Sequence, residues 1–270
     1  MLTKWITSME SFAPLVLPIL EIVRPKLIGE IGAAEGGNTR VLYEFQKTMQ
    51  GELITIDPFP RGSFLEWVRQ SSDVVTHLPE YSLQCIQKAG KIDVWFIDGD
   101  HNWYTVYNEL RLIDQLAQQN AMPGLIFLHD VGWPCARRDM YYNPTQIPAE
   151  FVHPYSSELG ITLDKSDSIR GGFKGPNWAL KEGGPKNGVL TAIEDFIQST
   201  TTRYHWINIP AILGLGVLVD EKHPLAKLII DFYAPYHNNP LLALMERDRI
   251  THYLALVALN DKQTNTISAV

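Results

Sequence analysis

Two short polar segments, each following an apolar run, contain residues that could do chemistry. The first, DGDH at 98–101, comes directly after the apolar run at 94–97. The second, His-Asp at 129–130, comes directly after the run at 125–128. Acids and imidazoles at the end of a buried strand carry a large desolvation cost unless they pair or bind something. Because an imidazole titrates near neutral pH, such a cluster could take a proton from a bound hydroxyl.

A glycine-rich segment near the N-terminus is a second candidate site. Residues 27–39 read LIGEIGAAEGGNT, which is a short apolar run, an acid, and then glycines that include Gly32 and Gly36. This order is typical of a strand that leads into a helix at the carboxyl edge of an α/β sheet, where ligands bind. The glycines are spaced more widely than in a G-x-G-x-x-G loop, and this favours an amino-acid tail and a ribose over a pyrophosphate. The alternative is a glycine turn without a ligand.

Two further residues follow predicted strands. Asp57 closes the apolar run at 53–56, and an acid at that place accepts hydrogen bonds from ribose hydroxyls. Ser82 follows the third predicted strand, over the base side of a bound nucleoside, so it could touch an adenine. The alternatives are a turn-forming Asp before a proline and a helix N-cap.

Adjacent strands would bring the polar segments together. If the strands at 94–97 and 125–128 are neighbours, then Asp98, His101, His129 and Asp130 share one crevice with the glycine loop and with Glu30. The alternative is a purely structural role in which Asp98 and Asp100 only cap the following helix. This explains one acid but not both acids and the histidine.

The composition limits the classes of partner. The chain has 270 residues, of which 23 are basic and 30 acidic, and its formal charge of −7 argues against a broad surface for nucleic acid. Cysteines occur only at 85 and 135, too few for a disulfide framework, so we expect a reducing cytoplasm. The apolar stretch at 12–23 is too short to span a membrane and lacks a cleavage pattern. We interpret it as a helix that covers the sheet edge, and we expect no membrane partner.

The order of predicted elements indicates one α/β domain over residues 1–270. Strands are expected at 27–31, 53–56, 74–77, 94–97, 125–128, 204–209 and 213–219, and helices at 12–23, 41–46, 62–70, 81–88, 103–118, 188–200, 224–233 and 240–259. Residues 132–187 lose periodicity but are rich in aromatics, which predicts an inserted lid with an acceptor pocket. The helical extension at 221–270 either caps the sheet or forms a homodimer contact.

These segments resemble a known family. The order EIGAAEGGNT, TIDPF, FIDGDHNW and LIFLHDVGWP is similar to the class I S-adenosylmethionine-dependent methyltransferases, in particular to a bacterial subgroup with a DGDH motif and a following HD pair. RRDMYYNPTQIP and EGGPKNGVLTAIEDF extend the resemblance over roughly residues 12–219. It implies a Rossmann-like, seven-stranded, mostly parallel sheet of order 3-2-1-4-5-7-6 with helices on both faces.

The resemblance also implies roles for the predicted site residues. By this comparison, Glu30 and Gly32 line the methionine end of S-adenosylmethionine, Asp57 holds the ribose and Asp98 lies near the sulfonium.

The subgroup is also similar to metal-dependent O-methyltransferases of the catechol and caffeoyl-coenzyme A type. That similarity implies that Asp98 and Asp130 hold a divalent ion such as Mg²⁺, and that His101 stands where those enzymes have a catalytic lysine. Val131 departs from the pattern because it replaces an asparagine ligand, for which His129 could substitute.

We therefore predict methyl transfer from S-adenosylmethionine to a small molecule, at a hydroxyl of a sugar or secondary metabolite. His101 is the predicted general base, and His129 is the reserve. Methyltransferases that act on bases of nucleic acids usually carry an Asn- or Asp-Pro-Pro-aromatic motif, where this chain has DGDH. The alternatives are methylation of an amine, a nicotinamide-dependent oxidoreductase, and a cofactor-binding protein without activity.

Overall fold

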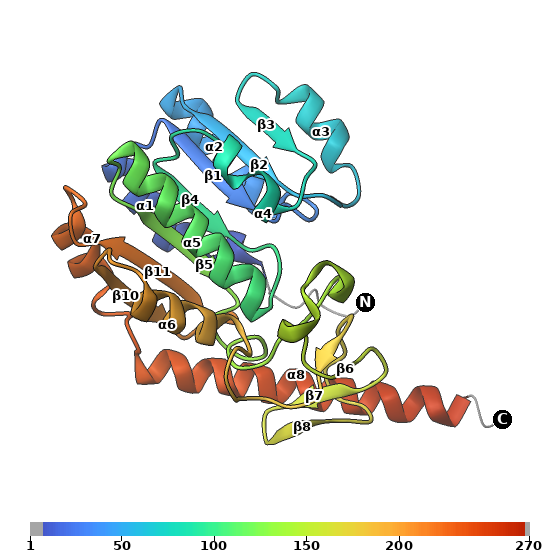
Figure 1. The fold of residues 1–270 in the computed structure, drawn as a ribbon. Helices are drawn as coiled ribbons and strands as arrows, with labels where there is room; N and C mark the ends of the chain where they lie inside the picture. Colours follow the sequence, from blue (N-terminus) through green and yellow to red (C-terminus); the bar gives the residue numbers. More distant parts are fainter. Residues whose placement is uncertain (1–7, 268–270) are drawn as a thin grey trace.

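The described part of the chain is built on one seven-stranded sheet. The structure is a computed structural model that describes residues 8–267, with side chains up to 260, so the predicted domain ends at 1–7 and 268–270 lie outside the described residues. Across the sheet the strands are β10 (Tyr204–Ile209), β11 (Leu215–Asp220), β5 (Leu125–His129), β4 (Val94–Ile97), β1 (Leu27–Ile31), β2 (Glu52–Ile56) and β3 (Val75–Leu78) (Figure 1).

The predicted topology is confirmed. The five strands β1 to β5 pair in parallel, whereas β11 pairs antiparallel with β5 and β10 antiparallel with β11. Counted along the chain, β10 and β11 are the sixth and seventh strands, so the order is the predicted 3-2-1-4-5-7-6. Every residue of β4 and β5 is buried, as expected for central strands covered on both faces.

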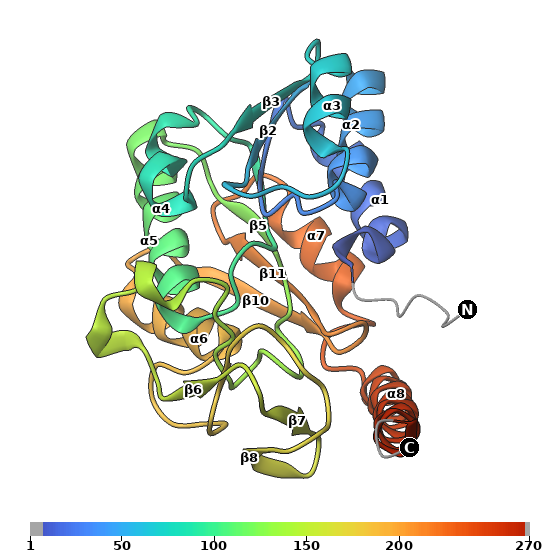
Figure 2. The ribbon, with the colours of Figure 1, turned by 90° about the vertical axis from the view of Figure 1, so that its right-hand side faces the viewer.

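Helices cover both faces of the sheet (Figure 2). One face carries α4 (Ser82–Cys85), the 3₁₀ turn Ile86–Lys88, α5 (Trp103–Asn120) and α6 (Val189–Ser199). The other carries the 3₁₀ turn Met9–Phe12, α1 (Ala13–Val23), α2 (Gly37–Met49), α3 (Phe64–Gln70) and α7 (Ala226–Tyr233). Some bounds differ from the prediction, because the expected helix at 81–88 is α4 plus a 3₁₀ turn and α2 is longer than 41–46.

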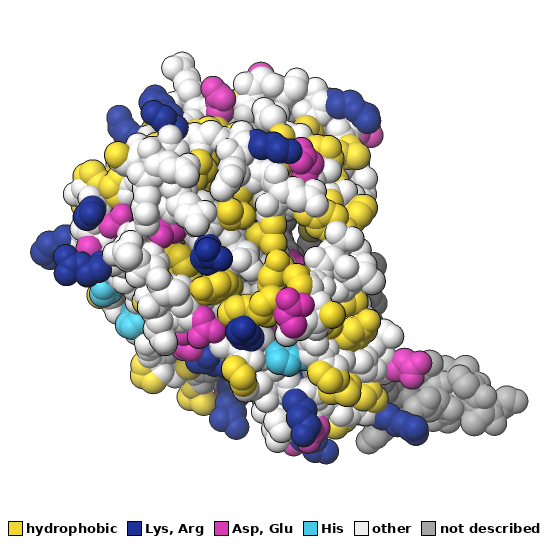
Figure 3. All heavy atoms as spheres, viewed as in Figure 1, with side chains coloured by type: hydrophobic (Ala, Val, Ile, Leu, Met, Phe, Trp, Pro, Cys, Tyr) yellow, Lys and Arg dark blue, Asp and Glu magenta, His cyan; other side chains and the backbone are white. Residues whose placement is uncertain are grey.

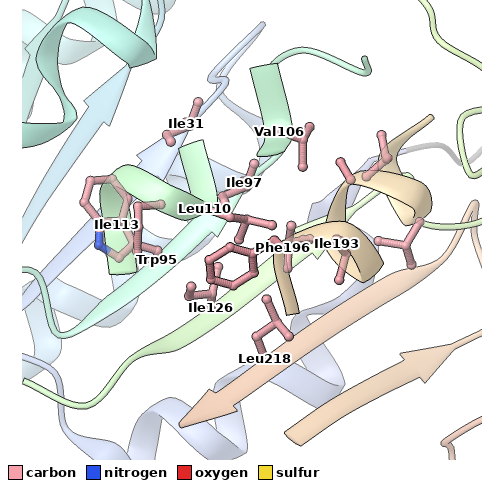
Figure 4. Close-up of a cluster of buried hydrophobic side chains, with 14 of the residues drawn as sticks. Ile31, Trp95, Ile97, Val106, Leu110, Ile113, Ile126, Ile193, Phe196 and Leu218 are labelled. Carbon is pink, nitrogen blue, oxygen red and sulfur yellow. The ribbon is translucent and has the colours of Figure 1, made fainter. Parts of the chain in front are cut away.

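Alternating side chains of the central strands pack into two separate hydrophobic cores, one on each face of the sheet. Trp95 and Ile97 of β4 face α5 and α6, whereas Val94 and Phe96 face α1, α2 and α7. Figure 4 shows the first core, in which side chains of α5 and α6 meet those of the strands.

The position predicted for the N-terminal helix is wrong. Val16, Ile19 and Leu20 of α1 pack in the second core, on a face of the sheet rather than at its edge. Their helical spacing forms an apolar stripe, and burying it against the central strands removes more apolar surface from water than an edge contact would.

The insertion at 132–187 contains short elements that the sequence does not predict. It has 3₁₀ turns at Pro144–Gln146 and Ala149–Phe151, and two small antiparallel pairs, β6 (Tyr155–Ser156) with β9 (Trp178–Ala179) and β7 (Gly160–Thr162) with β8 (Lys165–Ile169). Tyr141 and Trp178 are fully buried, so much of the aromatic content packs the insertion onto the domain.

A buried carboxylate joins the insertion to α5 and α6. Asp139 Oδ1 accepts hydrogen bonds from the backbone N–H groups of Trp103 and Gly188, both at 2.7 Å, and Oδ2 accepts one from the Tyr141 hydroxyl at 2.9 Å. Burial raises the pKa of Asp139 to about 6 despite these donors. One side chain therefore satisfies the start of two helices and fixes the insertion against them.

The last helix, α8 (Pro240–Ile267), runs beside the body of the molecule (Figure 1). It is longer than the predicted 240–259. Within the described residues, no helix combines the length and apolar character that crossing a membrane requires.

Charges are mixed on the molecular face drawn in Figure 3. Basic and acidic side chains alternate there, and hydrophobic side chains gather between them. This face has no broad basic patch, which accords with the formal charge of −7. That nucleic acid is not a partner stays a prediction.

The contacts of Asp139 generate a first prediction. Asp139→Ala leaves two buried N–H groups and a buried hydroxyl without their acceptor, so it should lower the free energy of unfolding by about 2 to 4 kcal/mol. Asp139→Asn keeps one carbonyl oxygen and should cost less. Urea unfolding followed by circular dichroism measures both. Glu158→Ala, at an exposed acid of the same insertion, is the control, and equal losses for Asp139→Ala and Glu158→Ala would contradict the assignment.

Candidate active site

A cavity of about 510 Å³ opens at the carboxyl ends of β1, β2 and β4. Its lining comes from the loops after these strands, from α4, from α5 and from the insertion. The residues include Gly32, Ala34, Asp57, Phe59, Arg61, Tyr81, Ser82, Gln84, Asp98, Asp100, Tyr104, Thr105, Glu109, Tyr142, Asn143 and Gln146. The position is the one at which open α/β sheets bind ligands.

The loop after β1 requires glycine for steric reasons. Gly32 has a φ of +90°, and a Cβ there would lie 2.1 Å from the carbonyl oxygen of Asp98. Gly36, with a φ of +82°, is the N-cap of α2 and does not line the cavity. Gly32 thus lets the backbone after β1 approach the backbone after β4, directly beside the cavity.

Glu30 lies beneath this loop rather than in the cavity. Its side chain is buried, and it accepts hydrogen bonds from Asn38 Nδ2 at 2.9 Å and Thr39 Oγ1 at 2.6 Å. Burial raises the pKa of Glu30 to about 7. In this arrangement Glu30 ties β1 to the first turn of α2, and its predicted contact with a cofactor stays a prediction.

Asp57 lines the cavity and closes the same loop. Its Oδ2 accepts from the N–H groups of Ala33 at 3.0 Å and Ala34 at 2.9 Å, and its Oδ1 accepts from Phe59 N at 2.8 Å. The end of β2 is thereby joined to the loop after β1.

Ser82 lines the cavity together with a residue that the sequence reasoning missed. Its hydroxyl donates to Oε1 of Glu109, which is fully buried on α5, while Oε2 of Glu109 has no hydrogen-bond partner. Burial raises the pKa of Glu109 to about 8. The sequence did contain a signal for Glu109, since it lies on the apolar side of α5 between the core residues Val106 and Leu110. Glutamate is seldom fully buried unless it is paired, so an acid at such a position indicates a polar partner or a site.

Asp98 belongs both to the cavity and to a cluster beside it. Its Oδ1 lies 3.2 Å from His129 Nδ1, which is 3.3 Å from Asp130 Oδ2. Asp130 Oδ2 is in turn 3.5 Å from His101 Nε2. The structure therefore brings together the four residues that the sequence assigned to one crevice.

Charge pairing sets the protonation of this cluster. Burial alone would lower the pKa of His129, but the carboxylates of Asp98 and Asp130 raise it well above its usual value. For Asp130, burial raises the pKa, yet His129 and His101 outweigh that effect and lower it. Asp130 also has a φ of +58°, a strained conformation that is common at functional sites.

A loop supported by α8 orients His129 from the other side. His129 Nε2 donates to the carbonyl oxygen of Ile212 at 2.9 Å, given the tautomer with its proton on that nitrogen. Ile212 and Leu213 both have positive φ, and Leu213 N donates to Glu246 of α8 at 2.8 Å. Arg249 holds that carboxylate in place, with Nε 2.7 Å from Glu246 Oε2.

His101 lies at the border between the cluster and the insertion. Its ring centroid is 5.7 Å from that of Tyr142, which lines the cavity and is 48% exposed. Phe151, Phe173 and Trp133 of the insertion instead pack against the first core. Of the aromatic residues in the described insertion, Tyr142 is therefore the one that lines the cavity.

The cluster has donors that suit a divalent ion. One ligand atom from each of Asp98, His129 and Asp130 lies within 4.8 Å of the others. Val131 is buried in the core and offers no ligand atom, so His129 is the third donor of this group. A histidine ligand whose second nitrogen donates to a carbonyl is a common arrangement at metal sites, and two carboxylates with one imidazole suit Mn²⁺, Fe²⁺ or Zn²⁺ better than Mg²⁺.

Comparison with known proteins identifies the segment that builds the site. Residues 30–131 match the model of a family described as a methyltransferase domain. This segment is similar to a methyltransferase domain and makes up less than half of the 270 residues. The matched segment includes the loop after β1, Asp57, Asp98 and both histidines of the cluster. Together with the strand order, it confirms the resemblance to class I methyltransferases.

Several solved structures, two of them described as methyltransferases, are similar to this chain at low identity. An S-adenosylhomocysteine-bound methyltransferase from Podospora anserina is 14% identical, with 79% of this chain and 78% of that chain covered and a TM-score of 0.47. Cofactor-bound Rv0187 from MTB is 13% identical, with 82% of this chain and 84% of that chain covered and a TM-score of 0.49. The O-methyltransferase TomG from Streptomyces achromogenes is 14% identical, with 81% of this chain and 83% of that chain covered and a TM-score of 0.46. A search of the curated proteins found no match.

The buried Glu109 generates a second prediction. In the folded protein Glu109 has a pKa of about 8 and keeps its proton at neutral pH. In the unfolded chain the same group loses its proton above its ordinary pKa of 4.5. The unfolded state then binds fewer protons, so the free energy of unfolding should fall as pH rises from about 5 to 8. Glu109→Gln keeps an acceptor for Ser82 and should flatten this decline.

Urea unfolding at pH 5, 6.5 and 8 measures the effect. Some slope will remain in the variant, because Glu30 is shifted in the same direction. Glu66→Gln, at an exposed position of α3, should follow the wild type. Identical slopes for Glu109→Gln and the wild type would contradict the assignment.

Proposed function

We propose that this protein transfers the methyl group of S-adenosylmethionine to a hydroxyl oxygen of a small molecule such as a sugar or secondary metabolite. The observation that carries the proposal is the double position of Asp98, which lines the cavity and also contacts the cluster of His129 and Asp130. A cofactor seat and a group of proton-handling residues thus meet at one carboxylate.

The residues around the cavity fit the cofactor. Gly32 keeps the loop after β1 open to close approach, and Asp57 offers carboxylate oxygens for ribose hydroxyls. Glu109 lines the cavity with an Oε2 that has no hydrogen-bond partner, and a polar edge of the base would supply one. When bound, S-adenosylmethionine supplies an electrophilic methyl group. The chain's own task is to orient it and exclude water.

We assign the proton transfer to His101. Its Nε2 faces Asp130 at 3.5 Å, and Asp130 would stabilise the imidazolium that forms when the histidine takes the proton of an acceptor hydroxyl. His129, the reserve base, is buried, and its two nitrogens face the carboxylates and Ile212, so it is better suited to hold the cluster than to reach an acceptor. Tyr142 and its neighbours in the insertion would form the wall on the acceptor side.

A divalent ion fits the same cluster. Asp98, Asp130 and His129 would hold it, and its chemistry there would be to lower the pKa of the acceptor hydroxyl. An amine acceptor is the nearest alternative, because the same crevice would serve a neutral nitrogen nucleophile.

Replacing His101 tests the general base. His101→Ala should lower kcat by about 10² to 10⁴, the usual contribution of a general base, while the Kd for S-adenosylhomocysteine stays within about threefold, because His101 does not line the cavity. Product formation by mass spectrometry and isothermal calorimetry measure the two quantities. His205→Ala, at an exposed position of β10, is the control. Unchanged turnover refutes the role, and absence of S-adenosylhomocysteine binding to the wild type refutes the proposed cofactor.

Metal titration tests the cluster independently of turnover. Calorimetry with Mn²⁺ should give one site per chain, and Asp98→Asn or Asp130→Asn should weaken it by about tenfold or more, because each removes a charged ligand. Asp231→Asn on the exposed side of α7 should bind like the wild type. If the wild type shows no heat with Mn²⁺, Mg²⁺ or Zn²⁺, the ion is excluded and His101 must act without it.

A further inference from the structure

One face of α8 carries a long apolar stripe. Five of its side chains are among the most exposed large hydrophobic residues in the described chain, namely Leu241 at 62%, Leu244 at 56%, Met245 at 60%, Leu256 at 52% and Leu259 at 57%. Residues three or four apart lie on one side of a helix, so these five and the exposed Asp248, His252 and Ala255 share a face. We call these eight residues the α8 stripe.

The opposite face of α8 is already used within the chain. Ile250 is buried, Tyr253 packs edge-on against Phe173 of the insertion with ring centroids 5.8 Å apart, and Glu246 accepts from Leu213. The helix therefore needs no further contact to stay on the body. Its stripe is left as an apolar surface of the kind that marks an interaction site.

The spacing of the α8 stripe reads the same from both ends. Starting at Leu241, the steps to the next stripe residue are 3, 1, 3, 4, 3, 1 and 3. An antiparallel pairing of two identical helices about a two-fold axis perpendicular to them has this property, because residue i meets residue j while j meets i. A different protein as partner would place no such demand on the spacing.

We propose that a second copy of this chain docks on the stripe, with the two α8 helices antiparallel and the two-fold axis at the level of residue 250. Leu241 then faces the partner's Leu259, and Leu244 faces the partner's Leu256. The paired segment of 19 residues is about 28 Å long at 1.5 Å per residue, enough for a short two-stranded coiled coil.

The polar centre of the stripe supports this register. In the proposed pairing, Asp248 faces the partner's His252, and His252 faces the partner's Asp248. His252 Nδ1 already contacts the carbonyl oxygen of Asp248 in its own helix at 2.8 Å, which leaves Nε2 to point outward. A carboxylate opposite an imidazole is a complementary polar pair and favours this antiparallel register, whereas a parallel pairing would place two carboxylates together.

Mass in solution tests the pairing. Light scattering during gel filtration should give twice the 30.6 kDa of one chain for the wild type. Leu244→Glu with Leu256→Glu should give the monomer, because it sets carboxylates against each other in an apolar seam. Leu228→Glu, at a leucine of α7 that is 42% exposed, is the matched control and should stay dimeric.

A charge exchange tests the register. His252→Glu alone places a carboxylate opposite Asp248, and Asp248→Arg alone removes the acceptor that faces His252. Each should raise the dimer Kd by about tenfold or more. The double variant should restore it, because each Arg then faces a Glu of the partner. Sedimentation equilibrium gives these constants.

Three outcomes would overturn the proposal: a monomeric wild type, a stripe variant that remains dimeric, or a double charge variant no tighter than the single ones. A wild type that is monomeric and binds lipid vesicles through the α8 stripe would also overturn the proposal.

Discussion

The close approach of the loops after β1 and β4 is the constraint on which the site depends. Asp98 N donates to Ile31 O at 2.8 Å, and Gly32 has no room for a Cβ against the Asp98 carbonyl. With its backbone fixed in this way, Asp98 presents one carboxylate to the cavity and to His129. The cavity and the cluster of Asp98, His129 and Asp130 are therefore held at a constant separation by backbone contacts, which do not depend on any bound molecule.

The sequence was sufficient for the sheet and for the clustering of the site. The runs at 94–97 and 125–128 are apolar throughout, as buried parallel strands must be, and each is followed at once by its polar residues. Adjacency of β4 and β5 then brings Asp98, His129 and Asp130 together without further information. The local pattern and the global topology agree here, which is why the inference succeeds.

Other parts depend on tertiary contacts that no local pattern contains. Glu109 reaches the cavity from the middle of α5. Helical periodicity places it on the apolar side with Val106 and Leu110, but it does not show that this position borders a cavity. The path of the insertion is fixed by contacts such as those of Asp139 with Trp103 and Gly188, whose partners are 36 and 49 residues away. The same limit applies to α1, since periodicity identifies an apolar stripe but not the surface that it covers.

The support of His129 has a consequence for shortened forms of the chain. His129 rests on the carbonyl of Ile212, the next peptide is held by Glu246, and Glu246 is part of α8. The terminal helix thus supports the cluster of Asp98, His129 and Asp130 and also forms part of the outer surface. Truncating the chain before residue 246 would remove the brace from a loop in left-handed conformation, and the imidazole would lose the contact that fixes its tautomer.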